Sequence, residues 1–153
     1  MKKLMLLIGL LTLALLTACS VSLDKGKLEQ TRYGDTDFES GVLMTVSPDV
    51  VSSDTKTLLL NIENAMDKKC TFGLEYTLEV QLDEAWYVVP PKQEISIIAI
   101  AQVLDPGGSA QLEALLADAY GKLPEGTYRY VKSFSLENGS AAAAAQFDIT
   151  VNK

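Results

Sequence analysis

Apolar and polar residues alternate along most of the chain after its first quarter. The clearest run is CTFGLEYTLEVQL, residues 70–82, in which six apolar side chains stand at every second position. Because neighbouring side chains of a β-strand point to opposite faces, this period predicts a strand with one buried face and one solvated face. Shorter runs of the same period predict strands over residues 42–46 and 58–62.

Turn residues mark the next strand. The pair Asp83-Glu84 predicts a hairpin into a strand over residues 85–89, which the two following prolines end. Within that strand Trp86 and Tyr87 are neighbours that face opposite ways, so we expect one to be buried and the other partly exposed. We interpret Trp86 as a structural residue, because aromatic side chains on a sandwich strand usually pack.

The middle of the chain contains a long apolar run. Residues 95–104 are rich in β-branched side chains, which predicts a buried, central strand. If this strand lay at a sheet edge instead, it would be a candidate contact site for a partner. The sequence DPGGS at 105–109 predicts a turn. Residues 109–120 fit both a helix and an alternating strand. Because a sandwich needs a strand here, we predict a strand over 109–116 and a short helical turn over 117–121.

The last part of the chain predicts a hairpin. Residues 127–136 form a strand with aromatic side chains on one face, and Lys132 interrupts that face. We therefore expect a bulge or a sheet edge at Lys132. Asn138-Gly139 is a strong signal for a two-residue hairpin turn, and the final strand covers residues 147–151.

Seven or eight short strands separated by turns predict an all-β fold, an antiparallel β-sandwich. The run LPEGTY at 123–128 resembles the tyrosine corner of immunoglobulin-like domains, in which a tyrosine hydroxyl bonds back to the backbone a few residues upstream. Together with WYVVPP at 86–91 and the DPGGS turn, it makes residues 42–153 resemble the bacterial immunoglobulin-like domains found on surface lipoproteins.

This resemblance implies an immunoglobulin-like β-sandwich over residues 42–153, with Tyr128 as a structural residue. It also implies a binding, adhesion or accessory module. Antibody-type domains carry their second disulfide cysteine two residues after the corner tyrosine, where this chain has Tyr130. We therefore expect the sandwich to be held by packing alone.

The first residues have the organisation of a secretory leader. Two lysines precede an apolar run over residues 4–16, which is too short to span a bilayer. The ending LTAC at 16–19 resembles the lipobox of bacterial lipoproteins. The resemblance implies that a signal peptide, residues 1–18, is removed and that Cys19 is the lipid attachment site.

A lipid on Cys19 would anchor the mature chain to the extracytoplasmic face of a bacterial membrane, which is either the cell membrane or an outer membrane. Two acyl chains give stable attachment where one is marginal. Residues 19–41 are polar and lack a period, so we predict a flexible tether. As a coil, its residues 20–41 would span on the order of 25 Å.

Charge narrows the choice of partner. The sequence has 13 basic and 20 acidic residues, and loss of Lys2 and Lys3 with the leader leaves 11 against 20, a mature charge of −9. This balance argues against nucleic acid and against an electrostatic grip on anionic lipids. The expected partners are the membrane, through the lipid on Cys19, and an envelope protein or glycan.

The sequence contains none of the common catalytic patterns. It has no histidine, which excludes Ser-His-Asp and Cys-His nucleophiles and most zinc sites. It also has no phosphate loop, no dinucleotide fingerprint and no Gly-x-Ser-x-Gly motif. We therefore predict a non-catalytic module without cofactor or metal. The alternative is an accessory subunit or regulator of an envelope enzyme.

Cys70 is the second cysteine of the sequence, and a lipid on Cys19 would leave it without a partner in the chain. Alternation places Cys70 in register with Phe72 and Leu74 on the inward face, which favours a packed, inert thiol. The two lysines that precede it favour a reactive thiolate instead, so both interpretations stay open.

Overall fold

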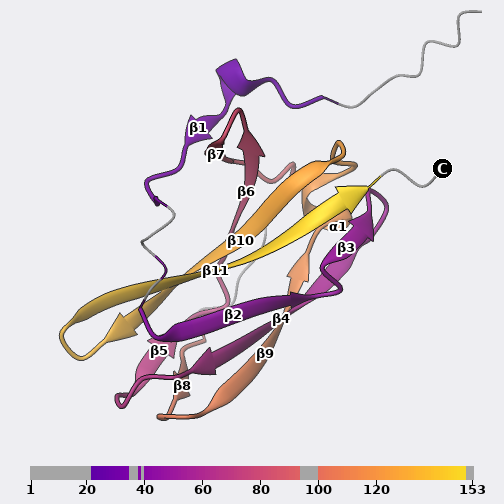
Figure 1. Cartoon of the computed structure of the whole chain (residues 1–153). Coiled ribbons are helices and arrows are strands. Elements are labelled where there is room, and N and C mark those ends of the chain that lie inside the picture. The colour runs from indigo at the N-terminus through magenta and orange to yellow at the C-terminus, as the bar shows by residue number, and fades with distance from the viewer. Residues whose placement is uncertain (1–21, 35–37, 39, 94–99, 151–153) are drawn as a thin grey trace, which may run out of the picture.

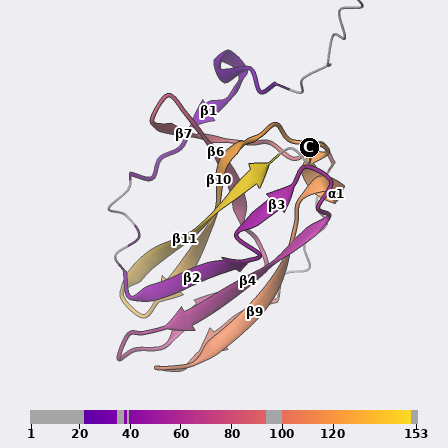
Figure 2. The same ribbon diagram turned by 45° about the vertical axis from the view of Figure 1, so that its right-hand side comes forward.

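The computed structural model describes residues 22–34, 38, 40–93 and 100–150. Their strands form two sheets that face each other (Figure 1, Figure 2). The predicted all-β sandwich is therefore confirmed. Within these residues the helices are short: the 3₁₀ helix η1 (Lys25–Lys27) and α1 (Ala117–Tyr120). No helix of the described ranges is long and apolar enough to cross a membrane.

The large sheet has eight strands. Its main path runs in spatial order through β1 (Glu29–Gln30), β7 (Ala85–Val88), β6 (Thr77–Leu82), β10 (Gly126–Leu136), β11 (Gly139–Thr150) and β3 (Val50–Ser52). β10 also pairs with β5 (Cys70–Phe72), which pairs in turn with β8 (Gln102–Leu104). Neighbouring strands are antiparallel except β11 and β3, which are parallel. The small sheet consists of β2 (Val42–Ser47), β4 (Thr57–Asn64) and β9 (Ser109–Leu115), with β4 in the centre.

The core lies between the sheets and is filled by side chains that alternation predicted to face inward. β2 and β4 keep the period of two, with every second residue buried. The largest apolar side chains that are fully buried are Tyr128, Tyr130, Phe134, Phe147, Leu60 and Ile62. The Tyr130 hydroxyl of the large sheet donates to the Leu115 carbonyl of the small sheet at 2.8 Å, so the aromatic core also links the sheets by a hydrogen bond.

The segment that fitted both helix and strand forms β9 followed by α1. The prediction of a strand with a short helical turn after it is confirmed. β9 pairs with β4 from Ser109, opposite Glu63, to Leu115, opposite Thr57. This pairing decides between the alternatives, because it satisfies backbone groups along the length of β4 that a helix would leave without partners.

Both predicted hairpins are present. β6 and β7 meet at a turn in which Asp83 and Glu84 have φ values of 49° and 65°, the left-handed conformation that a two-residue hairpin turn requires. β10 and β11 pair up to Leu136 opposite Gly139. The turn residues are therefore Glu137 and Asn138, one position earlier than the sequence predicted.

The strand predicted over residues 70–82 is broken into β5 and β6. β10 runs through Lys132 without interruption in its pairing with β11, so the bulge or edge predicted there is wrong. The Lys132 ammonium group instead donates to the carbonyls of Gly73 at 2.5 Å and Glu75 at 2.6 Å. The interruption lies in the neighbouring chain segment, and a buried lysine satisfies backbone groups that the break leaves without strand partners.

β8 (Gln102–Leu104) corresponds to the last residues of the strand predicted over 95–104. Residues 94–99 lie outside the described part of the chain. β8 pairs with β5 and lies at the margin of the sheet. Val103 is 60% exposed, whereas Leu104 is buried. The prediction of a buried, central strand is wrong for this part, because at a margin only the inward-facing side chains meet the core.

Candidate functional site

The first described residues form an N-terminal strap, residues 22–34, that lies along the large sheet (Figure 1). Its strand β1 pairs antiparallel with the edge strand β7. The Thr31 N–H then donates to the Trp86 carbonyl at 3.0 Å. The flexible tether predicted over residues 19–41 is therefore wrong for this stretch, because its backbone satisfies a sheet edge instead of remaining solvated.

The strap begins at one end of the sandwich. Leu23 and Leu28 pack against the core there, on either side of η1. Lys25 of η1 reaches the β6–β7 hairpin and forms an ion pair of 2.8 Å with Asp83. A groove of about 290 Å³ remains between the strap and this end of the sandwich. Its lining includes Leu23, Leu28, Val89, Pro90, Pro91 and Leu123.

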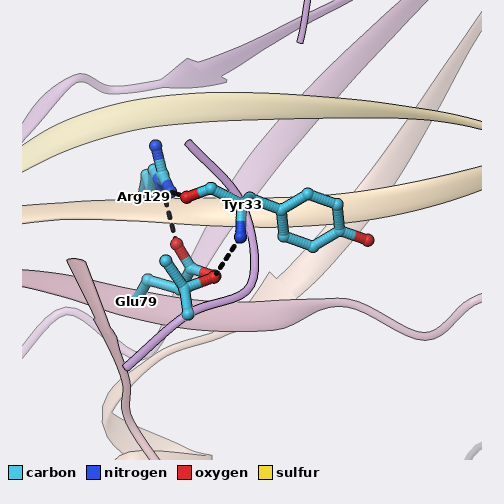
Figure 3. Close-up of polar contacts among 4 residues, drawn as sticks. Tyr33, Glu79 and Arg129 are labelled. Carbon is cyan, nitrogen blue, oxygen red and sulfur yellow. Dashed lines mark hydrogen bonds and ion pairs between the residues drawn. The ribbon is translucent and has the colours of Figure 1, made fainter. Parts of the chain in front are cut away.

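A buried ion pair between Glu79 of β6 and Arg129 of β10 lies next to the strap (Figure 3). The two residues are directly opposite each other in the sheet, and Arg129 Nε is 2.7 Å from Glu79 Oε2. The strap completes their hydrogen bonding. The Thr31 hydroxyl donates to Oε1 of Glu79, and Arg129 Nη2 donates to the Tyr33 carbonyl at 3.4 Å. The side chains of Arg129 and Glu79 are 5% and 1% exposed.

This ion pair lies on the outer face of the large sheet, the face that points away from the small sheet. Glu79 stands between Leu78 and Val80, whose side chains are both in the inter-sheet core, so its own side chain points the other way. Alternation had placed Glu79 on the solvated face. The structure agrees on the face, but the strap covers it, so that the carboxylate is buried.

Two aromatic rings contact the guanidinium group of Arg129. Its central carbon lies 4.2 Å from the ring centroid of Trp86 and 4.8 Å from that of Phe38. Trp86 is buried, but it is on the outer face and is not part of the inter-sheet core. Its neighbour Tyr87 is half-buried and packs against that core from the other face. Trp86 therefore packs chiefly on a cation, which a planar guanidinium suits well.

No local pattern in the sequence points to this arrangement. Glu79 and Arg129 are 50 positions apart, and only the register of β6 with β10 places them opposite each other. Burying one such charge alone carries a penalty of several kcal/mol. Each of the two charges therefore needs the other, together with the hydrogen bonds that the strap adds. The covered ion pair is thus a product of long-range pairing.

A second pocket, of about 290 Å³, opens beside the strap on the outer face. Tyr33 lines it, with its hydroxyl 3.1 Å from the Ser133 hydroxyl and 2.6 Å from the donating Arg32 Nη2. The side chains of Glu29 and Glu75 also line this pocket. The lining offers hydrogen bonds and charge. Nowhere in the described ranges do three or more His, Cys, Asp or Glu side chains gather so that they could hold a metal ion.

Tyr128 lies near the start of β10 and is fully buried. Its hydroxyl donates to the Pro124 carbonyl at 2.8 Å, which is the geometry of a tyrosine corner. Its ring stacks on Phe147 with 5.9 Å between centroids, and burial raises the pKa of its hydroxyl. Tyr128 therefore fixes the turn before β10 to the core.

Cys70 lies at the start of β5 in the inter-sheet core and is 1% exposed. Burial raises the pKa of its thiol, which disfavours the nucleophilic thiolate. The preceding Lys69 forms an exposed ion pair of 2.9 Å with Asp105. The inward position expected from alternation is therefore present. Cys19 and the leader at 1–18 lie outside the described residues.

Two facing sheets whose core is joined to a tyrosine corner define an immunoglobulin-like β-sandwich. A family model described as a bacterial Ig-like domain matches residues 38–148, and the chain belongs to this family. Domains of this family are generally non-catalytic binding modules. A comparison with curated proteins gave no match. The matched residues begin after the N-terminal strap, so the strap lies outside the part of the chain that the family model covers.

Proposed function

We propose that the protein is a bacterial lipoprotein whose Ig-like domain binds an envelope protein or glycan without catalysing a reaction. The anchor is a lipid on Cys19, at the extracytoplasmic face of the membrane. The observation that carries this proposal is the order of features in the chain. An apolar leader ends in LTAC at 16–19, and a bacterial Ig-like domain follows at 38–148. Such a leader directs export, and a diacylated cysteine retains the chain at a membrane.

One edge of the small sheet supports a binding role. In the described part of the chain, β9 pairs with β4 alone and has one open side, whereas the other side of β2 lies next to β11 (Figure 1, Figure 2). Open strands present backbone groups that accept an extended segment of another chain. A depression of about 510 Å³ lies on the same sheet, lined by residues that include Leu43, Thr45, Asn61 and Gln111. Leu43 is 53% exposed, which adds an apolar contact to these polar groups.

The chemistry of the described side chains supports a non-catalytic role. The sequence has no histidine to act as a base near neutral pH. Glu79 and Arg129 are engaged with each other and with the strap, and the Cys70 thiol is buried. These groups stabilise the domain and are not open to a substrate.

Mass spectrometry of the membrane-bound protein tests the anchor. The wild-type chain should begin at Cys19 and carry the mass of the acyl groups. Cys19→Ala should keep its leader and carry no acyl mass, whereas the control Cys70→Ala should be processed and acylated like the wild type. Normal processing of Cys19→Ala would contradict the proposed anchor.

Cross-linking in the native envelope tests the binding role, with the full-length protein as bait. We expect a defined envelope protein or glycan to be captured by the wild type. A charge on the small sheet, Leu43→Glu, should weaken this capture, whereas Val50→Glu at an exposed position of β3 in the large sheet should leave it unchanged. Turnover of peptidoglycan or peptide substrates that persists in pure protein would contradict the non-catalytic role.

A further inference from the structure

We propose that the N-terminal strap holds one end of the sandwich against the lipid headgroups and so fixes the orientation of the domain on the membrane. The membrane-facing end comprises the β6–β7 hairpin, residues 89–92 and residues 120–123. The opposite end, with the β10–β11 hairpin and the β8–β9 turn, then points away from the bilayer. This inference rests on the proposed lipid attachment at Cys19.

The length of chain between the lipid and the first docked residue carries the argument. Ser22 and Leu23 already line the groove at this end of the sandwich, and Leu23 packs against the core. Only residues 20 and 21 separate Cys19 from Ser22. Because an extended chain spans at most about 3.6 Å per residue, Ser22 lies within about 11 Å of the lipidated residue. A free tether over residues 20–41 would instead allow the domain to turn in any direction.

The strap is attached at several separate points, so it cannot swing as a simple hinge. Leu23 and Leu28 pack on the core, and Lys25 pairs with Asp83. β1 then pairs with β7, and Thr31 bonds to Glu79 on the outer face. These contacts follow one another along the strap and involve packing, charge and backbone pairing. Releasing the domain from its orientation therefore requires all of them to break together.

The membrane-facing end is suited to contact with headgroups. Pro90 and Pro91 are exposed there beside the apolar groove. Three of its lysines pair with carboxylates: Lys25 with Asp83, Lys27 with Asp24 and Lys122 with Asp54. This end thus carries charges of both signs, although the mature chain as a whole is acidic. The lipid supplies the attachment, and this end can approach both zwitterionic and anionic headgroups without strong repulsion.

The two ends are well separated (Figure 1, Figure 2). β4 runs between them: the Lys56 carbonyl just before it accepts from Leu116 near α1, and its last residue Asn64 bonds to Gly107 of the β8–β9 turn. Its eight residues span about 27 Å at roughly 3.4 Å per residue. This separation is large enough for a fluorescence measurement to tell which end faces the bilayer.

Energy transfer to labelled headgroups tests the proposal. Lys122→Cys marks the membrane-facing end and Lys69→Cys the opposite end, each in the full-length acylated chain with Cys70→Ala. The sites are matched, because both lysines are exposed and both form a surface ion pair. In phosphatidylcholine vesicles with acceptor-labelled headgroups, transfer should be at least about twofold stronger from Lys122→Cys, given the length of β4.

Two further variants test the part that the strap plays. An insertion of about ten Gly and Ser residues between residues 21 and 22 lengthens the tether without touching the strap contacts, and should remove the difference in transfer. Leu23→Ser with Leu28→Ser should do the same by releasing the strap. The matched control, Leu43→Ser with Leu59→Ser at exposed positions of the small sheet, should keep the difference.

The outcomes separate this inference from the anchor on which it rests. A chain that carries no acyl mass overturns the anchor and the orientation together. Acylated protein with equal transfer from both positions overturns the orientation alone. If the difference in energy transfer between Lys122→Cys and Lys69→Cys survives the Gly-Ser insertion, the strap does not set the orientation, because a long flexible tether cannot hold one end of the domain against the membrane.

Discussion

Glu79 and Arg129 form an ion pair of 2.7 Å on the outer face of the large sheet, opposite each other on β6 and β10. Both are buried, although neither belongs to the hydrophobic core between the sheets. Their cover is the N-terminal strap, which precedes the part of the chain that the family model matches at residues 38–148. The stability of the domain therefore depends on a segment outside that match.

Breaking this pair on one side should be more damaging than removing it. Arg129→Met leaves the Glu79 carboxylate buried without its partner and should lower the free energy of unfolding by about 3–5 kcal/mol. Glu79→Leu combined with Arg129→Met removes both charges and should be less destabilising than Arg129→Met alone. Urea unfolding of the three proteins checks the order. A double variant less stable than the single one would contradict this account of the pair.

The single tryptophan should report on the docking of the strap. Trp86 is buried on the outer face, and its carbonyl accepts from the Thr31 N–H. Thr31→Pro removes that donor and should loosen the strap, which exposes the indole and shifts its emission to longer wavelength. Thr31→Val keeps the backbone donor and loses only the two bonds of the hydroxyl, which donates to Glu79 and accepts from the Tyr33 N–H, so its shift should be smaller. Equal emission from Thr31→Pro and wild type would show that the strap does not depend on this bond.

Tyr128→Phe should lower the free energy of unfolding by about 1 kcal/mol, the net contribution of a typical hydrogen bond. The variant keeps the buried ring and loses only the bond to the Pro124 carbonyl. The urea midpoint should therefore fall slightly, and capture of an envelope partner should stay the same. An unchanged midpoint would mean that the tyrosine corner does not stabilise this domain.

Cys70 should react slowly with thiol reagents in the folded protein and rapidly in denaturant. Its side chain is 1% exposed, and burial raises the pKa of the thiol, so both access and thiolate formation are limited. An exposed thiol introduced by Lys122→Cys, in a chain with Cys70→Ala, is the control and should react rapidly in both conditions. Rapid reaction of native Cys70 would place it at the surface and contradict the packing described above.

Lys132 should make stability depend on pH above neutrality. Burial lowers the pKa of its ammonium group from 10.5 to about 8. Between these values the unfolded chain binds a proton that the folded chain has lost, so the free energy of unfolding rises with pH. Relative to Lys132→Met, the wild type should gain about 1 kcal/mol between pH 8 and pH 9.5. Parallel curves for the two proteins over this range would contradict a lowered pKa for Lys132.

Local pattern was a sufficient guide where one face of a strand meets the core. Alternation predicted β2 and β4, and the burial of every second residue follows it. The turn at Asp83 and Glu84 was also readable, because two acidic residues separate two runs with strand character, although glutamate rarely adopts the positive φ that it has there. For residues 109–120 the spacing of leucines fitted two structures, and the choice of a strand depended on an assumption about the whole sandwich.

Local pattern failed where burial depends on a distant segment. Lys132 was expected at a bulge or an edge, but it sits within the continuous strand β10, because the break in the neighbouring chain segment offers it two carbonyls. Residues 22–34 were expected to be a tether because they are polar. A short polar segment can still dock by backbone pairing, which depends on the partner edge of β7 and leaves little trace in side-chain pattern.

The class of fold and the inward side chains of most strands could be predicted from the sequence, because they depend on residues close together in the chain. The burial of Glu79, the packing of Trp86 on Arg129 and the cover of the Glu79–Arg129 pair by the strap became visible only in the tertiary structure. The physical reason is that strand register and the docking of a remote segment set which charges meet. Neither is encoded in the period of a single strand.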